Sequence, residues 1–193
     1  NLTLTNVRFE NNTTDHPTGA TSVQVGGAVS AQGNLTVDRS TFVGNKTDGY
    51  GGAINFSGLS GRVTNSVFAS NSSGSPGAAI NASNASGSLT LLNNTFTDAY
   101  KNPKEAVLVN GSATLKNNIF DSFLSSLTAS GATALVSEDY NLLSGDTNIP
   151  QALNSAVVTS GGHDRIAASP RFVDPAAFNY HVQQNSPAID LGV

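Results

Sequence analysis

The sequence predicts an all-β protein built as a single-stranded parallel β-solenoid, with three short strands in each coil. Three observations predict this fold class: a phenylalanine recurs about every 26 residues, aliphatic residues keep a fixed distance from it, and apolar and polar residues alternate in short runs. Equivalent residues of successive coils should therefore stack about 4.8 Å apart, as neighbouring strands do. We expect about five to seven coils and a C-terminal cap.

Each repeat is predicted to contribute its strands in a constant order. The first strand follows a glycine pair, as in Gly51 to Phe56, and carries an inward aliphatic residue (Ile54, Ile80 and Leu108 in three of the repeats). The second strand resembles Leu35 to Val37, where apolar and polar residues alternate with period two.

The third strand carries the repeated phenylalanine, which we expect to fill a narrow core. The predicted phenylalanine ladder consists of Phe9, Phe42, Phe68, Phe96 and Phe120. Three residues before most of these positions stands an asparagine, predicted to occupy a corner where its amide bonds to the backbone and to the next coil. These corner asparagines are Asn6, Asn65, Asn93 and Asn117.

The repeat pattern ends near Asp146, so residues 1–146 are predicted to form the solenoid. Residues 147–193 contain four of the seven prolines. We expect this segment to be a cap of the same domain that covers the last coil, because an open solenoid end exposes unpaired backbone and core.

The composition excludes several classes of function. Charged residues make up 11% of the chain and the net charge is −4 with nine Lys and Arg, so no basic surface for nucleic acid is expected. Cysteine is absent, which excludes disulfides and thiolate metal sites. No apolar run reaches the ~18 residues that span a membrane, and the sequence predicts no cofactor and no metal.

Two sets of motifs resemble known bacterial surface proteins. Gly26 to Val29 and Gly51 to Ile54 match the GGA-aliphatic motif of the chlamydial polymorphic membrane proteins, and Phe9 to Asn12, Phe42 to Asn45 and Phe68 to Asn71 match their F-x-x-N motif. The tail, with Phe172 to Pro175 and Ser186 to Gly192, is similar to that of surface β-helix proteins with exchangeable anchors. Gly77 to Ile80 departs by lacking the second glycine.

The resemblance implies a right-handed parallel β-helix that is secreted and often adhesive. Pectate lyases and polygalacturonases share this architecture, but the Asn-Thr-Asp, Asp-Asp, Gly-His-Gly and Arg-Ile-Lys motifs of the hydrolases are absent, and acidic residues do not recur on one face as a lyase calcium site requires. The densest titratable cluster is Gly162 to Arg165. It admits a histidine base oriented by Asp164, or a polar surface loop in which Asp164 and Arg165 pair. We prefer the surface loop.

Two further groups of residues are candidate sites. Tyr50 and Tyr100 stand in loops predicted to share one edge of the solenoid and are the expected binding residues. Asn-x-Ser/Thr sequons are more frequent than composition predicts. The candidate glycan acceptors are Asn11, Asn45, Asn71, Asn81 and Asn110.

The sequence therefore predicts a non-catalytic, extracellular structural or adhesive module of a cell-surface or secreted protein. Its expected partners are host or matrix glycans, and either flanking repeats of a longer chain or other copies of itself at the open N-terminal coil. A self-assembling filament subunit and a pectate-lyase-like, polysaccharide-active enzyme remain the alternatives.

Overall fold

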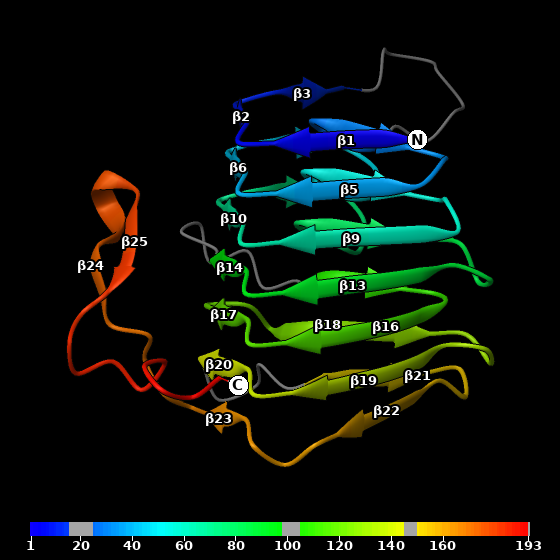
Figure 1. Ribbon diagram of the computed structural model, residues 1–193. Helices are drawn as coiled ribbons and strands as arrows, with labels where there is room; N and C mark the ends of the chain where they lie inside the picture. The colour runs from blue at the N-terminus through cyan, green and yellow to red at the C-terminus, as the bar shows by residue number, and fades with distance from the viewer. Residues whose placement is uncertain (16–24, 98–104, 145–149, 193) are drawn as a thin grey trace.

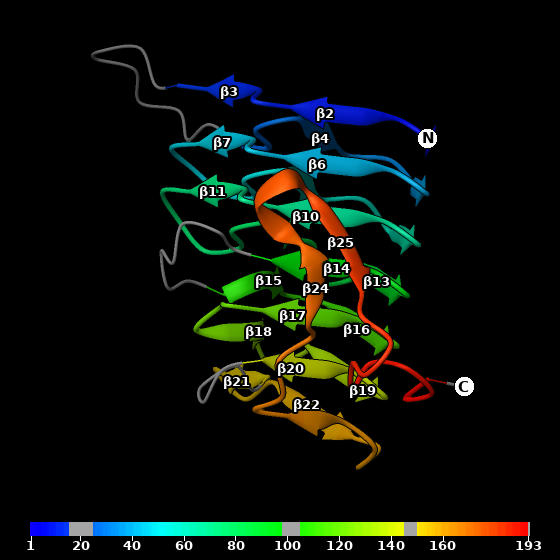
Figure 2. The same ribbon diagram turned by 90° about the vertical axis from the view of Figure 1, so that its left-hand side faces the viewer.

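Three parallel sheets run along the sides of a solenoid in the computed structural model (Figures 1 and 2), which describes residues 1–15, 25–97, 105–144 and 150–192. The first sheet contains β1 (Leu2–Thr5), β5 (Leu35–Asp38), β9 (Ser60–Thr64), β13 (Ser88–Leu92), β16 (Ser112–Lys116), β19 (Leu135–Asp139) and β22 (Val157–Ser160). The second contains β2 (Arg8–Glu10), β6 (Thr41–Val43), β10 (Val67–Ala69), β14 (Thr95–Thr97), β17 (Ile119–Asp121), β20 (Leu142–Ser144) and β23 (Arg165–Ile166).

The third sheet contains β4 (Val29–Ala31), β8 (Ile54–Phe56), β12 (Ile80–Ala82), β15 (Glu105–Val109), β18 (Ser125–Ser130) and β21 (Gln151–Leu153). The predicted all-β solenoid with three strands per coil is thus confirmed. A small fourth sheet of β3 (Thr13–Thr14), β7 (Lys46–Thr47) and β11 (Ser72–Ser73) was not expected, because these dipeptides begin segments that the sequence presents as loops.

The phenylalanine column forms the centre of the core. Phe42, Phe68, Phe96 and Phe120 are at most 1% exposed, and successive rings from Phe9 to Phe120 are stacked with centroids 4.8 to 5.0 Å apart. The separation equals the strand spacing because equivalent phenylalanines are paired in register. Stacking therefore follows directly from the parallel pairing.

The corner between the first and second sheets requires a left-handed backbone. Asn6, Asn65, Asn93 and Asn117 have φ between 52° and 57°, a conformation that asparagine tolerates better than most residues. Asn93 Nδ2 donates to Asn65 Oδ1 over 3.3 Å. Arg39 occupies the same corner with φ of 47°. This corner position therefore requires the left-handed backbone conformation but not an asparagine side chain.

A stronger ladder lies one residue further along the chain and was not predicted. This corner ladder consists of Ser40, Ser66, Asn94, Asn118, Asn141 and Asp164. In each coil the backbone N–H donates to the side-chain oxygen of the next coil, for example from Asn94 N to Asn118 Oδ1 over 3.0 Å. The side-chain amide also donates back, as Asn118 Nδ2 does to Leu91 O over 2.9 Å. The ladder thus satisfies backbone groups that the tight corner buries.

The glycine pairs permit close packing of successive coils. Gly51 has φ of +70°, and a Cβ on Gly52 would lie 2.2 Å from Ala78 O of the next coil. A side chain at Gly52 would collide with that backbone, so the turn needs glycine.

The solenoid extends beyond the predicted boundary at residue 146. Strands β21, β22 and β23 pair in parallel with β18, β19 and β20 and form a further coil that reaches Ile166. The sequence pattern places the end of the solenoid too early because Leu143 and Ile166 occupy the core column where earlier coils have phenylalanine. The phenylalanine repeat therefore stops before the solenoid does.

The C-terminal residues do not form the expected cap over the last coil. Antiparallel β24 (Phe172–Asp174) and β25 (Asn179–Val182), joined by the 3₁₀ turn η1 (Pro175–Ala177), form a hairpin that lies beside the second sheet (Figures 1 and 2). The rings of Phe172 and Tyr180 are nearly perpendicular, with centroids 5.4 Å apart. This segment therefore covers a lateral face of the solenoid.

One inward position was also misassigned. Ile80 is paired with Val107, so Val107 and not Leu108 continues the core column of Ile54 and Ile80. Leu108 consequently points to the outside of the third sheet. The spacing from the ladder phenylalanine to the next inward residue of the third sheet changes here, because the connecting segment before β15 differs in length from that of the other repeats.

Replacing Asn118 with alanine should lower the free energy of unfolding by about 3 kcal/mol, because Asn94 N–H, Leu91 C=O and Asn141 Oδ1 lose buried partners. Urea denaturation followed by circular dichroism measures the change. The matched control is Asn34→Ala on an exposed turn, expected within about 0.5 kcal/mol of the parent. Equal stability of both variants would show that the corner ladder is dispensable.

Candidate functional site

A groove runs along the outer face of the third sheet, with a cavity volume of about 830 Å³. Its floor is a column of residues from adjacent strands, which are paired in register: Asn55, Asn81, Leu108, Thr128 and Gln151. A second column, two residues further along each strand, adds Ser57, Ser83, Asn110, Ser130 and Leu153. Tyr50, Pro76 and Val25 line one margin. The groove therefore combines neutral polar groups with a few apolar surfaces.

The amides in the floor are buried and form the beginning of a ladder. Asn55 is 7% and Asn81 3% exposed, and Asn81 Nδ2 donates to Asn55 Oδ1 over 2.6 Å. Asn81 Oδ1 is buried and has no hydrogen-bond partner among the described residues. The next residue in the column is Leu108, whose side chain has no donor. The ladder thus ends on an unsatisfied acceptor at the floor of the groove.

The groove is almost uncharged. Among its described lining residues, Glu105 alone carries a charge, and its Oε1 accepts the backbone N–H of Gly77 over 3.2 Å. A carboxylate without a lining cation disfavours a polyanionic ligand. The chemistry available here is hydrogen bonding to neutral groups and contact with apolar faces.

The structure brings one of the two predicted tyrosines to this groove. Tyr50 lies at its margin, where the backbone of residue 50 pairs with that of Val25 as an isolated parallel bridge. Tyr100 lies outside the described residues. The sequence did not predict that Asn55, Asn81 and Thr128 line a groove, and Asn81 was predicted only as a glycan acceptor. Nothing in the sequence distinguishes an outward polar column that lines a groove from one that faces solvent.

Three of the predicted glycan acceptors are incompatible with a glycan on the folded chain. Asn45 is 0% exposed and its Nδ2 donates to Phe9 O and Asn71 Oδ1. Asn71 Nδ2 likewise donates to Phe42 O, and Asn81 is bonded as described above. A second short ladder of Asn12, Asn45 and Asn71 explains these positions structurally. Asn11 is exposed and Asn110 half-buried, so they remain the predicted acceptors.

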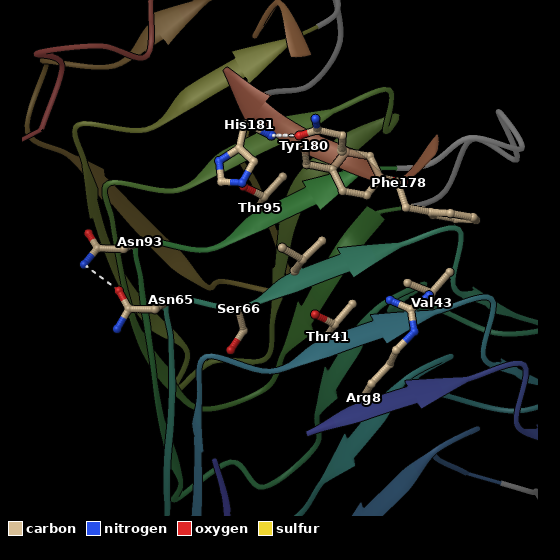
Figure 3. Close-up of a pocket in the computed structure, with 12 residues that line it drawn as sticks. Arg8, Thr41, Val43, Asn65, Ser66, Asn93, Thr95, Phe178, Tyr180 and His181 are labelled. Atoms are coloured by element: carbon tan, nitrogen blue, oxygen red, sulfur yellow. Dashed lines mark hydrogen bonds between the residues drawn. The ribbon is translucent and has the colours of Figure 1, made fainter. Parts of the chain in front are cut away.

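A second groove lies between the C-terminal hairpin and the second sheet, with a volume of about 570 Å³ (Figure 3). Phe178, Tyr180 and His181 of the hairpin region face Thr41 and Thr95 of the sheet. Arg8 lies at one end, where its Nε donates to Glu10 Oε2 over 2.9 Å. None of the unpartnered buried polar atoms of the described residues belongs to this groove, so it carries weaker evidence for a ligand than the third sheet does.

Two acidic residues meet at the last coils. Glu138 replaces the aliphatic residue of the core column next to Leu115 and is 4% exposed. Its Oε2 accepts Asn141 Nδ2 over 3.1 Å, while Asp164 Oδ1 accepts the Asn141 backbone N–H over 2.6 Å. Burial and the neighbouring Asp164 carboxyl raise the pKa of Glu138 from 4.5 to about 8. Glu138 is enclosed in the solenoid, and neither of these two carboxyl groups lines either groove.

His163 is held by a different acid from the one suggested by the sequence. Its Nδ1 lies 2.9 Å from Asp139 Oδ1 on the preceding coil, and its ring stacks on Tyr140 with centroids 4.5 Å apart. Asp164 accepts hydrogen bonds from Asn141, so the expected surface pairing of Asp164 with Arg165 is replaced by a role in the corner ladder. His163 ties two coils together at the surface.

In the ranges that the structure describes, no three His, Cys, Asp or Glu side chains gather where they could hold a metal ion. None of the helices in the described part of the chain has the length and hydrophobicity needed to cross a bilayer.

Comparison with known proteins identifies one similarity. A family model described as "Right handed beta helix region" matches residues 1–140. No curated protein and no solved structure matches the chain significantly.

The raised pKa of Glu138 predicts a stability that falls with increasing pH. Because the unfolded carboxyl loses its proton near pH 4.5 and the folded one near pH 8, this contribution is fully present below pH 4.5 and lost by about pH 8. Urea midpoints at pH 4, 6 and 8 should decrease. The variant Glu138→Gln should flatten this dependence, and an unchanged pH slope in that variant would contradict the assignment.

Proposed function

The chain belongs to the right-handed β-helix family, and on that premise we propose that it is a non-catalytic, extracellular adhesive module that holds an uncharged, hydroxyl-rich carbohydrate in the groove of its third sheet. The observation that carries the proposal is the unpartnered oxygen of Asn81, buried in the floor of that groove. A buried acceptor without a donor costs about 1–3 kcal/mol, which a ligand hydroxyl or amide can recover.

The lining suits a carbohydrate in two further respects. Neutral side chains repeat at every strand, about 4.8 Å apart, and offer hydrogen bonds along the length of a polymer. Tyr50, Leu108 and Leu153 supply apolar surface against which the faces of sugar rings can pack. The scarcity of charge explains why the preferred ligand is neutral.

A polysaccharide-active enzyme is disfavoured by the placement of the carboxyl groups. Cleavage of a glycosidic bond by two carboxyls needs both beside the bound chain. Glu138 and Asp164 are close together, but Glu138 is enclosed in the core column and lines neither groove. The third-sheet groove offers only Glu105 among its described residues.

Calorimetric titration with neutral oligosaccharides tests the proposal. The variants Tyr50→Ala and Gln151→Ala should each weaken binding by about fivefold, the equivalent of one hydrogen bond or ring contact. Thr36→Ala, on the exposed face of the first sheet, is the matched control. Absence of binding to every neutral oligosaccharide would refute the proposal, and shortened products in the titrated sample would refute its non-catalytic part.

A filament of stacked copies is the second candidate. It is favoured by the strands β1, β2 and β4, each of which pairs on one edge only, and by the partial exposure of Leu2, Leu4 and Phe9. The corner ladder opposes it: the backbone N–H of Asp164 in one copy would meet Val7 of the next, where no side-chain oxygen is available.

Electron microscopy of the purified chain at neutral pH distinguishes the two candidates. We expect short single rods, because the corner ladder is interrupted at such a junction. Long fibres would contradict this expectation and would make homotypic stacking the principal function.

A further inference from the structure

We propose that Asn81, Leu108 and Thr128 recognise a secondary amide of the bound ligand, and that this amide is the acetamido group of an N-acetylated amino sugar. The inference rests on the proposed function and names the substrate class of the same groove.

The three residues form one column across adjacent strands. Asn81 of β12 is paired with Leu108 of β15, and Leu108 with Thr128 of β18. All three line the groove and are at most 9% exposed. A hydrogen-bond acceptor, an apolar surface and a hydroxyl therefore follow one another at the strand spacing of about 4.8 Å.

The acceptor has a defined direction. Asn81 Nδ2 is engaged by Asn55 Oδ1 on the preceding coil, over 2.6 Å. Since the two branches of a planar amide point to opposite sides, Oδ1 is directed away from Asn55 and toward the Leu108 side of the column. This oxygen is the buried, unpartnered one.

By comparison with the corner ladder, the donor that Asn81 Oδ1 lacks is an amide N–H. In the corner ladder, the oxygen of each interior asparagine accepts the amide of the preceding one, as Asn118 Oδ1 accepts Asn94 Nδ2 over 3.1 Å. The groove ladder runs the other way, so an asparagine at position 108 would donate to Asn81 Oδ1. Leu108 takes that place and leaves room above its side chain in the groove. A ligand amide lying over Leu108 would complete the ladder.

The column is complementary to both ends of such an amide. In a trans amide the N–H and the C=O point in opposite directions, so the N–H can donate to Asn81 Oδ1 while the C=O accepts the Thr128 hydroxyl. The two residues are two strand spacings apart, about 9.6 Å, and an amide with a hydrogen bond of about 2.9 Å at each end spans most of that distance. The acetyl methyl would then contact Leu108.

A sugar acetamide fits the groove better than a peptide strand. An extended peptide presents backbone amides about every 3.4 Å, whereas the described part of the groove holds one unpartnered buried acceptor. The flanking Ser57, Ser83 and Ser130 hydroxyls suit sugar hydroxyl groups. Glu105 disfavours uronic acids in the same position.

The test compares two β-1,4-linked hexasaccharides, one of N-acetylglucosamine and one of glucose, by calorimetry on the full chain. The N-acetylated probe should bind at least about tenfold more tightly, the equivalent of two hydrogen bonds. Leu108→Asn supplies the missing donor from the protein, so this variant should bind the N-acetylated and the glucose hexasaccharides about equally. Thr128→Val, which keeps the side-chain volume, should reduce it by about fivefold.

Leu92→Asn, the same substitution on the outer face of the first sheet, is the matched control and should keep the full preference. Equal binding of the two hexasaccharides would overturn this inference and leave the proposed function intact, whereas binding of neither would overturn both. If a ten-residue serine–glycine peptide binds as tightly as the N-acetylated probe, the assignment to a sugar is wrong. Should Leu108→Asn fail to fold, as judged by circular dichroism, Thr128→Val decides alone.

Discussion

Parallel, in-register stacking is the constraint on which the rest of this structure depends. Strand residues of the interior coils lie directly above and below their equivalents, so each such position must be compatible with a near copy of itself about 4.8 Å away. Phenylalanine satisfies the constraint by ring stacking in the core. Asparagine satisfies it at the corners because one amide carries both a donor and an acceptor. A buried carboxyl satisfies it by keeping its proton to higher pH, as Glu138 does because burial and the neighbouring Asp164 raise its pKa.

The sequence predicts the fold well because that constraint makes the chain repetitive. The phenylalanine register identified the coils from Phe9 to Phe120, and the alternation around Leu35 to Val37 identified the strands. The prediction fails where phenylalanine is replaced: Leu143 and Ile166 continue the core column without an aromatic ring, so the sequence pattern predicts a cap where the structure has a further coil. Leu108 was placed inward because the repeat length varies before β15.

The candidate site could be predicted only in small part. Tyr50 was chosen from its loop and does lie at the groove margin, but the floor of the groove depends on which polar columns are enclosed, and enclosure is a property of the assembled solenoid. Asn45, Asn71 and Asn81 show the same difficulty. Each has the sequence pattern of a glycan acceptor, while burial gives each a structural bond. Polar residues in such a fold can only be assigned to surface or ladder once the pairing register is known.

The corner ladder has a direction, and this direction has a consequence for biosynthesis. Each backbone N–H at the corner, from Val7 to Asn141, is accepted by a side chain of the following coil. During translation from the N-terminus, every newly emerged coil therefore waits for its successor before its corner is satisfied. The corner N–H of Asn141, for example, receives its acceptor only once Asp164 has been synthesised. The hydrogen bonds of the corner ladder therefore form one coil behind the growing chain, so that each coil stabilises the one made before it.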